Sequence, residues 1–141
     1  MSNTTLLPGN FSVTLKAKDL GAAVSQENPA YRNGFGASLR LVGAAFVSKA
    51  GITGDATNYN TVSLLNKGLL GAGTTPMASK AFDTPGDDDV PAYGSGALDL
   101  AAAEADRILA PGEVMSIDKA ASGTGAAFAD DLVELTFQFG S

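Results

Sequence analysis

The chain has 141 residues, a net charge of −6, and no cysteine, histidine or tryptophan. The missing cysteine and histidine exclude a disulfide framework, thiolate catalysis, Ser-His-Asp catalysis and the usual zinc sites. The acidic balance, and the lack of a basic stripe with interleaved aromatic residues, predict that nucleic acid is not a partner.

A polar arm at residues 1–10 opens the chain, and we expect it to precede a single domain at residues 11–141. Phe11, Val13 and Leu15 then alternate with polar residues. Side chains of a strand point to opposite faces in turn, so this pattern predicts a strand with one face in a core.

The same alternation predicts further strands along the chain. It is clearest in the last one, where Val133, Leu135 and Phe137 share a face with Phe139. The full set after the first strand, in chain order, is residues 38–48, 61–65, 78–82, 96–101, 107–109, 114–118 and 132–139. A short helix near residues 98–109 stays open beside the strands there, because its alanine-rich middle has high helix propensity.

Turn signals separate these strands. They are Asn33-Gly34, Pro85-Gly86, Pro111-Gly112 and the glycine-rich stretch at residues 122–125. Short strands divided by such turns are typical of all-β folds. The sequence therefore predicts an antiparallel β-sandwich or jelly roll, with a small barrel as the remaining form.

Three polar stretches resemble chemical sites, and each has a simpler interpretation. Consecutive acids at residues 87–89 cannot all point at one ion, so we expect an exposed acidic loop and not a calcium site. The segment at residues 68–75 is rich in glycine but lacks the lysine of a phosphate-binding loop, which favours a flexible connection. Asp130 and Asp131 are neighbours at the start of a strand, where side chains face opposite ways, and so do not form a catalytic pair.

Aromatic residues are scattered along the chain. Phe11, Phe137 and Phe139 are in phase with core faces, so we expect them to fill the core. The three tyrosines, Tyr31, Tyr59 and Tyr93, lie in turn-like surroundings, where an amphipathic ring suits a contact surface. Core filling remains the general expectation for aromatic residues.

Charge is unevenly spread along the chain. Residues 1–70 carry six basic and three acidic groups (+3), and residues 71–141 carry three basic and twelve acidic groups (−9), which sum to −6. We expect the two halves to interleave in one fold, with head-to-tail contact between copies as the alternative. No apolar run reaches the roughly 18 residues of a membrane span, and the N-terminus has no basic start of a secretory signal. The sequence therefore predicts a protein made in a cytoplasm, with no membrane partner.

Four stretches resemble small β-sandwich proteins encoded among bacteriophage head genes. They are residues 41–47 (LVGAAFV), 61–68 (TVSLLNKG), 108–117 (ILAPGEVMSI) and 123–135 (GTGAAFADDLVEL). Together with the acidic, cysteine-free composition, they make residues 36–140 similar to capsid decoration, or cement, proteins. The resemblance implies a homo-oligomer, commonly a trimer, that binds the major capsid protein on the outer surface of the virion.

The sequence thus predicts a non-enzymatic viral structural protein that stabilises a capsid. It predicts no catalytic, cofactor-binding or metal-binding residue, and no cofactor. Two alternatives stay open: a receptor- or carbohydrate-binding module of a phage tail or fibre, and an enzyme that uses two acids brought together by the fold.

Overall fold

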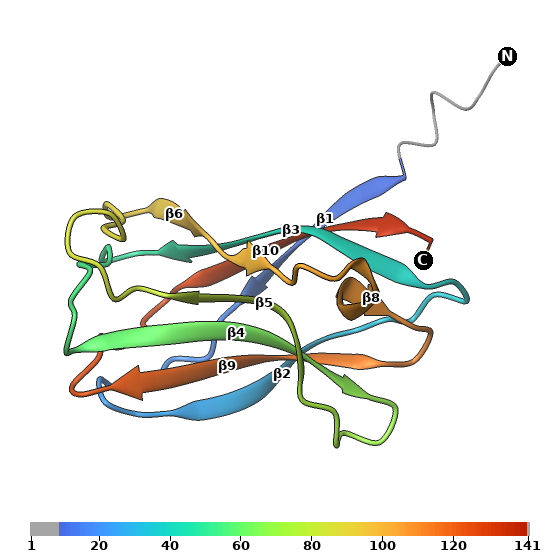
Figure 1. The fold of residues 1–141 in the computed structure, drawn as a ribbon, viewed down its shortest axis with the longest axis horizontal. Helices are drawn as coiled ribbons and strands as arrows, with labels where there is room; N and C mark the ends of the chain where they lie inside the picture. The colour runs from blue at the N-terminus through green and yellow to red at the C-terminus, as the bar shows by residue number, and fades with distance from the viewer. Residues whose placement is uncertain (1–8, 141) are drawn as a thin grey trace, which may run out of the picture.

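The computed structural model describes residues 9–140, which fold into two antiparallel sheets packed face to face (Figure 1). The first sheet has the order β1 (Asn10–Lys16), β10 (Leu132–Phe139), β3 (Leu39–Ser48) and β6 (Gly94–Ala97), with β8 (Ile108–Leu109) also pairing with β3. The second has the order β2 (Gln26–Arg32), β9 (Val114–Ser122), β4 (Tyr59–Gly68), β5 (Thr75–Ala81) and β7 (Asp99–Leu100). The predicted all-β fold is confirmed.

The strands pair in a nested way. The first strand, β1, pairs with the last, β10, while β2 pairs with β9, β3 with β8 and β6, and β4 with β5. Such nesting is what results when one long antiparallel hairpin is rolled into two layers, and it gives the sandwich the connectivity of a jelly roll. It also interleaves the basic and acidic halves of the chain, since β4 lies between β9 and β5.

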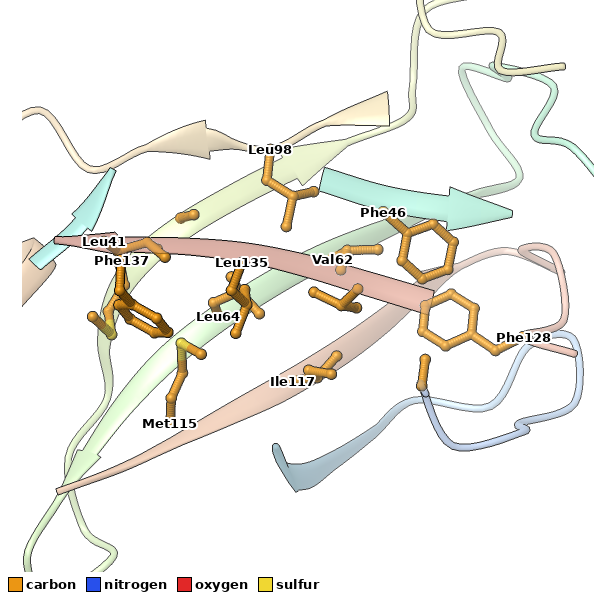
Figure 2. Packing of buried hydrophobic residues seen from close by; sticks show 14 of the residues in the cluster. Leu41, Phe46, Val62, Leu64, Leu98, Met115, Ile117, Phe128, Leu135 and Phe137 are labelled. Atoms are coloured by element: carbon orange, nitrogen blue, oxygen red, sulfur yellow. The ribbon is translucent and has the colours of Figure 1, made fainter. Parts of the chain in front are cut away.

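The core lies between the sheets and follows from the alternation of each strand. Val133, Leu135 and Phe137 of β10 are fully buried, as are Val62 and Leu64 of β4. Figure 2 shows Leu135 and Phe137 meeting Val62 and Leu64 in the layer between the two sheets. At one end of this layer the rings of Phe46 and Phe128 lie with their centroids 4.8 Å apart.

Strand β3 changes its inward face part-way along. Leu39 and Leu41 point into the core, and then Phe46 does, so the phase shifts by one residue. A bulge causes the shift, because Thr136 pairs with Gly43 whereas Phe137 pairs with Leu41. The bulge explains why the alternation of this strand fades in the sequence.

Two elements differ from the sequence expectations. Strand β2 is not among the predicted strands, because its sequence, QENPAYR, is polar and contains a proline. Residues 98–109 hold no α-helix: β7 and β8 flank a short 3-10 helix, η2 (Glu104–Arg107). Of the predicted N-terminal arm, residues 1–8 lie outside the described residues, and Asn10 is the first residue of β1.

Candidate functional site

The start of β1, the end of β10 and the connection from β4 to β5 lie at one end of the sandwich (Figure 1). Large hydrophobic side chains are exposed on this end. Phe35 is 45% exposed, Phe139 47%, Leu69 71% and Leu70 94%. We call these four residues the apolar end. Exposed apolar side chains gathered in one region are typical of protein contact surfaces.

Phe35 is placed by contacts with other rings. Its centroid lies 5.7 Å from that of Phe11 and 5.1 Å from that of Phe139, in both cases edge to face. Phe11 in turn lies 5.8 Å from the buried ring of Phe137. The exposed rings are therefore continuous with the core. Phe139 was predicted to fill the core and instead remains half-exposed as the last residue of β10.

Asn33 shapes the loop that presents Phe35. Its buried side chain donates to the carbonyl oxygens of Ala37 (2.9 Å) and Leu109 (2.8 Å) and accepts a hydrogen bond from the Phe35 N–H (2.9 Å). Its backbone is also bonded to Gly112 and Glu113. Hydrogen bonds of Asn33 therefore fix the turn predicted at Asn33-Gly34, and they hold Phe35 in place before any partner binds.

Leu69 and Leu70 lie in the connection between β4 and β5. The Asn66 side chain accepts a hydrogen bond from the Gly68 N–H (2.8 Å), and the Gly73 N–H donates to the Lys67 carbonyl oxygen (3.0 Å). These bonds close the loop on itself and leave both leucines on its outside. Lys67 forms an ion pair with Glu27 of β2 (3.3 Å). It therefore connects two strands of the second sheet and is not placed to bind a phosphate.

A groove of about 390 Å³ lies between β2, β9 and the connection from β1 to β2. Its lining includes Lys16, Lys18, Gln26 and Asn28, together with the buried Lys119. The Lys119 ammonium donates to two carbonyl oxygens of the connection, and burial lowers its pKa. This lysine fastens the connection to β9.

No protein-family model, curated protein or solved structure matches this chain. Its function is therefore inferred from its own surface. Along residues 9–140, no helix has the length and apolar character needed to cross a membrane.

The acidic loop at residues 87–89 is only partly exposed. Asp88 is buried, forms an ion pair with Lys80 (2.8 Å) and accepts a hydrogen bond from the Thr84 N–H (2.8 Å). Asp89 accepts hydrogen bonds from the Gly54 and Gly86 N–H groups. The acids therefore hold the loop together, and within the described residues no group of three or more acidic side chains is placed to bind a metal ion.

Asp130 and Asp131 have separate surroundings. Asp130 is exposed and pairs with both Lys16 and Lys49 at 3.3 Å, which lowers the pKa of its carboxyl group. Asp131 is buried, which raises its pKa, and it accepts hydrogen bonds from the Lys49 and Ala129 N–H groups. The Asp130 carboxylate forms ion pairs on the surface, and the Asp131 carboxylate holds the backbone where β10 begins.

The three tyrosines occupy different positions. Tyr31 is part of strand β2 and packs against the core, and Tyr59 is the first residue of β4. Tyr93 is 74% exposed in a turn, with a positive φ of 60°. The prediction that Tyr31 lies in turn-like surroundings is wrong, because pairing with β9 holds the polar strand β2 extended.

Three residues of the apolar end, Phe35, Leu69 and Leu70, were not singled out from the sequence, whereas Phe139 was assigned to the core. Phe35 follows a turn signal, and Leu69 and Leu70 interrupt a glycine-rich stretch, so each is a large apolar residue inside a predicted connection. A hydrophobic residue in a loop is the signal that could have found them, since loops are usually on the surface.

Proposed function

We propose that this chain is a non-enzymatic structural protein that binds the outer surface of a bacteriophage capsid and stabilises the shell. Its partners are the major capsid protein and further copies of itself. The observation that supports this function is the apolar end: four large hydrophobic side chains exposed on loops and a strand end, two of them within a ring cluster that continues into the core. Such side chains lose unfavourable contact with water when another protein covers them.

The free energy available from the apolar end suits a protein that makes several weak contacts with a shell at once. Full burial of one leucine or phenylalanine side chain contributes about 1.5–3 kcal/mol. One copy then needs to bury only a modest area, on the order of 800 Å² per partner, when a symmetric oligomer engages several sites at once. The braced Asn33 loop reduces the entropy lost on binding, because Phe35 is already ordered.

The architecture agrees with this proposal by analogy. Jelly rolls are frequent among viral capsid proteins and also among lectins, and a fold by itself does not determine a function. The groove beside Lys119 is the concave surface that a carbohydrate-binding module could use. Of the described aromatic residues, Phe128 alone lines it, and that ring is buried, so the groove offers no stacking platform for a sugar.

The test uses capsids of the encoding virus assembled without this chain. We expect the purified protein to co-sediment with these shells, to appear as added density on their outer surface by electron microscopy, and to raise their melting temperature. A Leu69→Ser/Leu70→Ser variant is expected to bind at least tenfold more weakly, because two exposed leucines no longer become buried.

Tyr93→Ser is the matched control, since Tyr93 is also a large exposed side chain but lies in the turn before β6 and not at the apolar end. It should bind shells like the unmodified protein. Absence of shell binding would contradict the proposal, as would equal binding by the leucine variant. Specific retention on a glycan array, with no affinity for shells, would support the receptor-binding alternative instead.

A further inference from the structure

Strand β1 has one edge that no described strand occupies. It pairs with β10 on one side, and within residues 9–140 no other strand lies along its second side. It has seven residues, NFSVTLK, with no proline and a single charged side chain. A long edge of this kind presents unpaired N–H and C=O groups and can pair with another strand.

The other sheet edges are protected. At the edge of the second sheet, β2 contains Pro29 and has a register shift between Pro29 and Tyr31. The opposite edges are formed by β6 with four residues and by β7 and β8 with two each. Proline, bulges and shortness are the usual means by which proteins prevent edge pairing, and β1 has none of them.

Backbone bonds show which groups of β1 point outward. The Ala17 N–H donates to the Asp131 carbonyl oxygen (2.9 Å), and the Phe139 N–H donates to the Gly9 carbonyl oxygen (3.0 Å). Hydrogen-bonded pairs alternate along an antiparallel ladder, so the odd-numbered residues of β1 bond to β10. The backbone N–H and C=O groups of Asn10, Ser12, Thr14 and Lys16 therefore face the open edge.

The apolar face of β1 is also incomplete. Phe11, Val13 and Leu15 pack against the core but are only partly buried. A further strand with apolar residues at alternate positions would extend the sheet and cover the flank of these side chains.

We propose that the open edge of β1 binds β1 of a second copy, antiparallel, about a two-fold axis at Val13. In this register Ser12 faces the partner's Thr14, so outward backbone groups meet outward backbone groups and both N–H···O bonds of each pair can form. Phe11 faces the partner's Leu15, which places apolar beside apolar. The single cation, Lys16, faces the partner's Asn10, so no like charges oppose each other.

A second copy suits this edge because the sequence of β1 is complementary to itself under a two-fold axis, as an isologous interface requires. The contact would join the two first sheets into one continuous sheet. It is independent of shell binding and differs from the trimer implied by the resemblance to decoration proteins. The mass of the assembly in solution therefore distinguishes the proposed dimer from a trimer.

The experiment compares two charge variants of the full chain. In Ser12→Lys/Thr14→Lys, the introduced cations face each other across the axis twice, and we expect the dimer to dissociate about tenfold more readily. In Ser12→Glu/Thr14→Lys, each introduced cation faces an introduced anion, and dimerisation should be retained or strengthened. Both variants keep every backbone N–H group, and both place the same lysine opposite Glu134 of β10.

Sedimentation velocity over a range of concentrations gives the mass and the dissociation constant, and hydrogen exchange reports on the amides of Ser12 and Thr14. We expect a concentration-dependent dimer in which these two amides are protected. A monomer at every concentration, a trimer, a dimer with unprotected Ser12 and Thr14 amides, or equal behaviour of the two charge variants would overturn the proposal. Hydrogen exchange at Ser12 and Thr14 of the unmodified chain tests the β1–β1 contact even if a variant fails to fold.

Discussion

The ring of Tyr31 stacks on the ring of Phe137, with centroids 5.2 Å apart and an interplanar angle of 27°. Tyr31 belongs to β2, at the edge of the second sheet, and Phe137 belongs to β10, in the interior of the first sheet. This contact anchors a polar strand to the core of the opposite sheet. It explains how a sequence with little alternation of its own becomes part of the sandwich.

Tyr31→Ala is expected to lower the free energy of unfolding by about 2–3 kcal/mol, since it removes a partly buried ring and its stacking on Phe137. Tyr31→Phe keeps the ring and should change stability by less than about 1 kcal/mol. Urea unfolding of both variants measures the difference. Equal stability of the two variants would show that the stacked ring does not hold β2.

Gly54→Ala is expected to destabilise the protein by about 1–3 kcal/mol, because its new methyl group would lie 2.2 Å from the carbonyl oxygen of Thr84. Gly36→Ala is the control: among residues 9–140, no atom apart from those of its chain neighbours lies within 4 Å of the position of its Cβ. Its effect should stay within about 1 kcal/mol. Thermal unfolding of the two variants gives the comparison, and a neutral Gly54→Ala would contradict the close approach.

Asp88→Asn is expected to reduce stability at neutral pH. The ion pair with Lys80 and the hydrogen bond from Thr84 lower the pKa of the Asp88 carboxyl group below its ordinary value of 3.8. A lowered carboxyl pKa stabilises the fold above the ordinary value, and this contribution is lost as the pH falls through the lowered one. Melting temperatures of variant and parent should therefore differ at neutral pH and converge in stronger acid.

Asp87→Asn serves as the control for that measurement, because Asp87 is exposed in the same loop. It should leave the melting temperature nearly unchanged. If both variants behaved alike, the stabilisation by the Lys80–Asp88 pair would be refuted.

Asp118→Asn is expected to increase stability at neutral pH by on the order of 1 kcal/mol or less. Burial, and then the neighbouring carboxylate of Glu27, raise the pKa of Asp118 above 3.8. A raised carboxyl pKa means that the ionised form costs free energy in the folded state, so the gain is present above the raised pKa and vanishes below 3.8. Unfolding free energies measured at both ends of this range test the sign.

Glu27→Gln should have the opposite effect. The Ser116 hydroxyl donates to the Glu27 carboxylate at 2.5 Å and, despite a smaller opposing effect of burial, lowers its pKa. Its ionised form therefore stabilises the fold, and the variant should be less stable at neutral pH. Two carboxylates that face each other in neighbouring strands would thus respond in opposite directions.

Strands with a regular apolar face could be predicted from the sequence. The alternation of Val133, Leu135 and Phe137 depends only on the period of an extended chain, and β10 has the bounds that this pattern predicts. The inward face of β3 was harder to predict, because the bulge at Val42 moves this face from Leu41 to Phe46. A bulge is a property of the paired strands, so one strand's sequence does not reveal it.

The apolar end could be found only in part. The turn at Asn33-Gly34 is visible in the sequence, whereas the bond from Asn33 to the carbonyl oxygen of Leu109 joins residues 76 positions apart. That bond braces the loop and so decides how Phe35 is presented. Exposure of Leu70 likewise depends on how the β4–β5 connection closes on Lys67.

The sequence by itself determined that this protein is an all-β sandwich without cysteine or histidine chemistry, because side-chain alternation and residue types are local properties. Only the tertiary structure decided that β1 pairs with β10 and that no other described strand lies along its second edge, that Asp88 and Lys119 are buried, and that Phe35, Phe139, Leu69 and Leu70 are exposed at one end. These features arise from contacts between distant segments. The free energy of each contact depends on which groups meet and on how much water they exclude. Neither quantity can be read from a single stretch of the sequence.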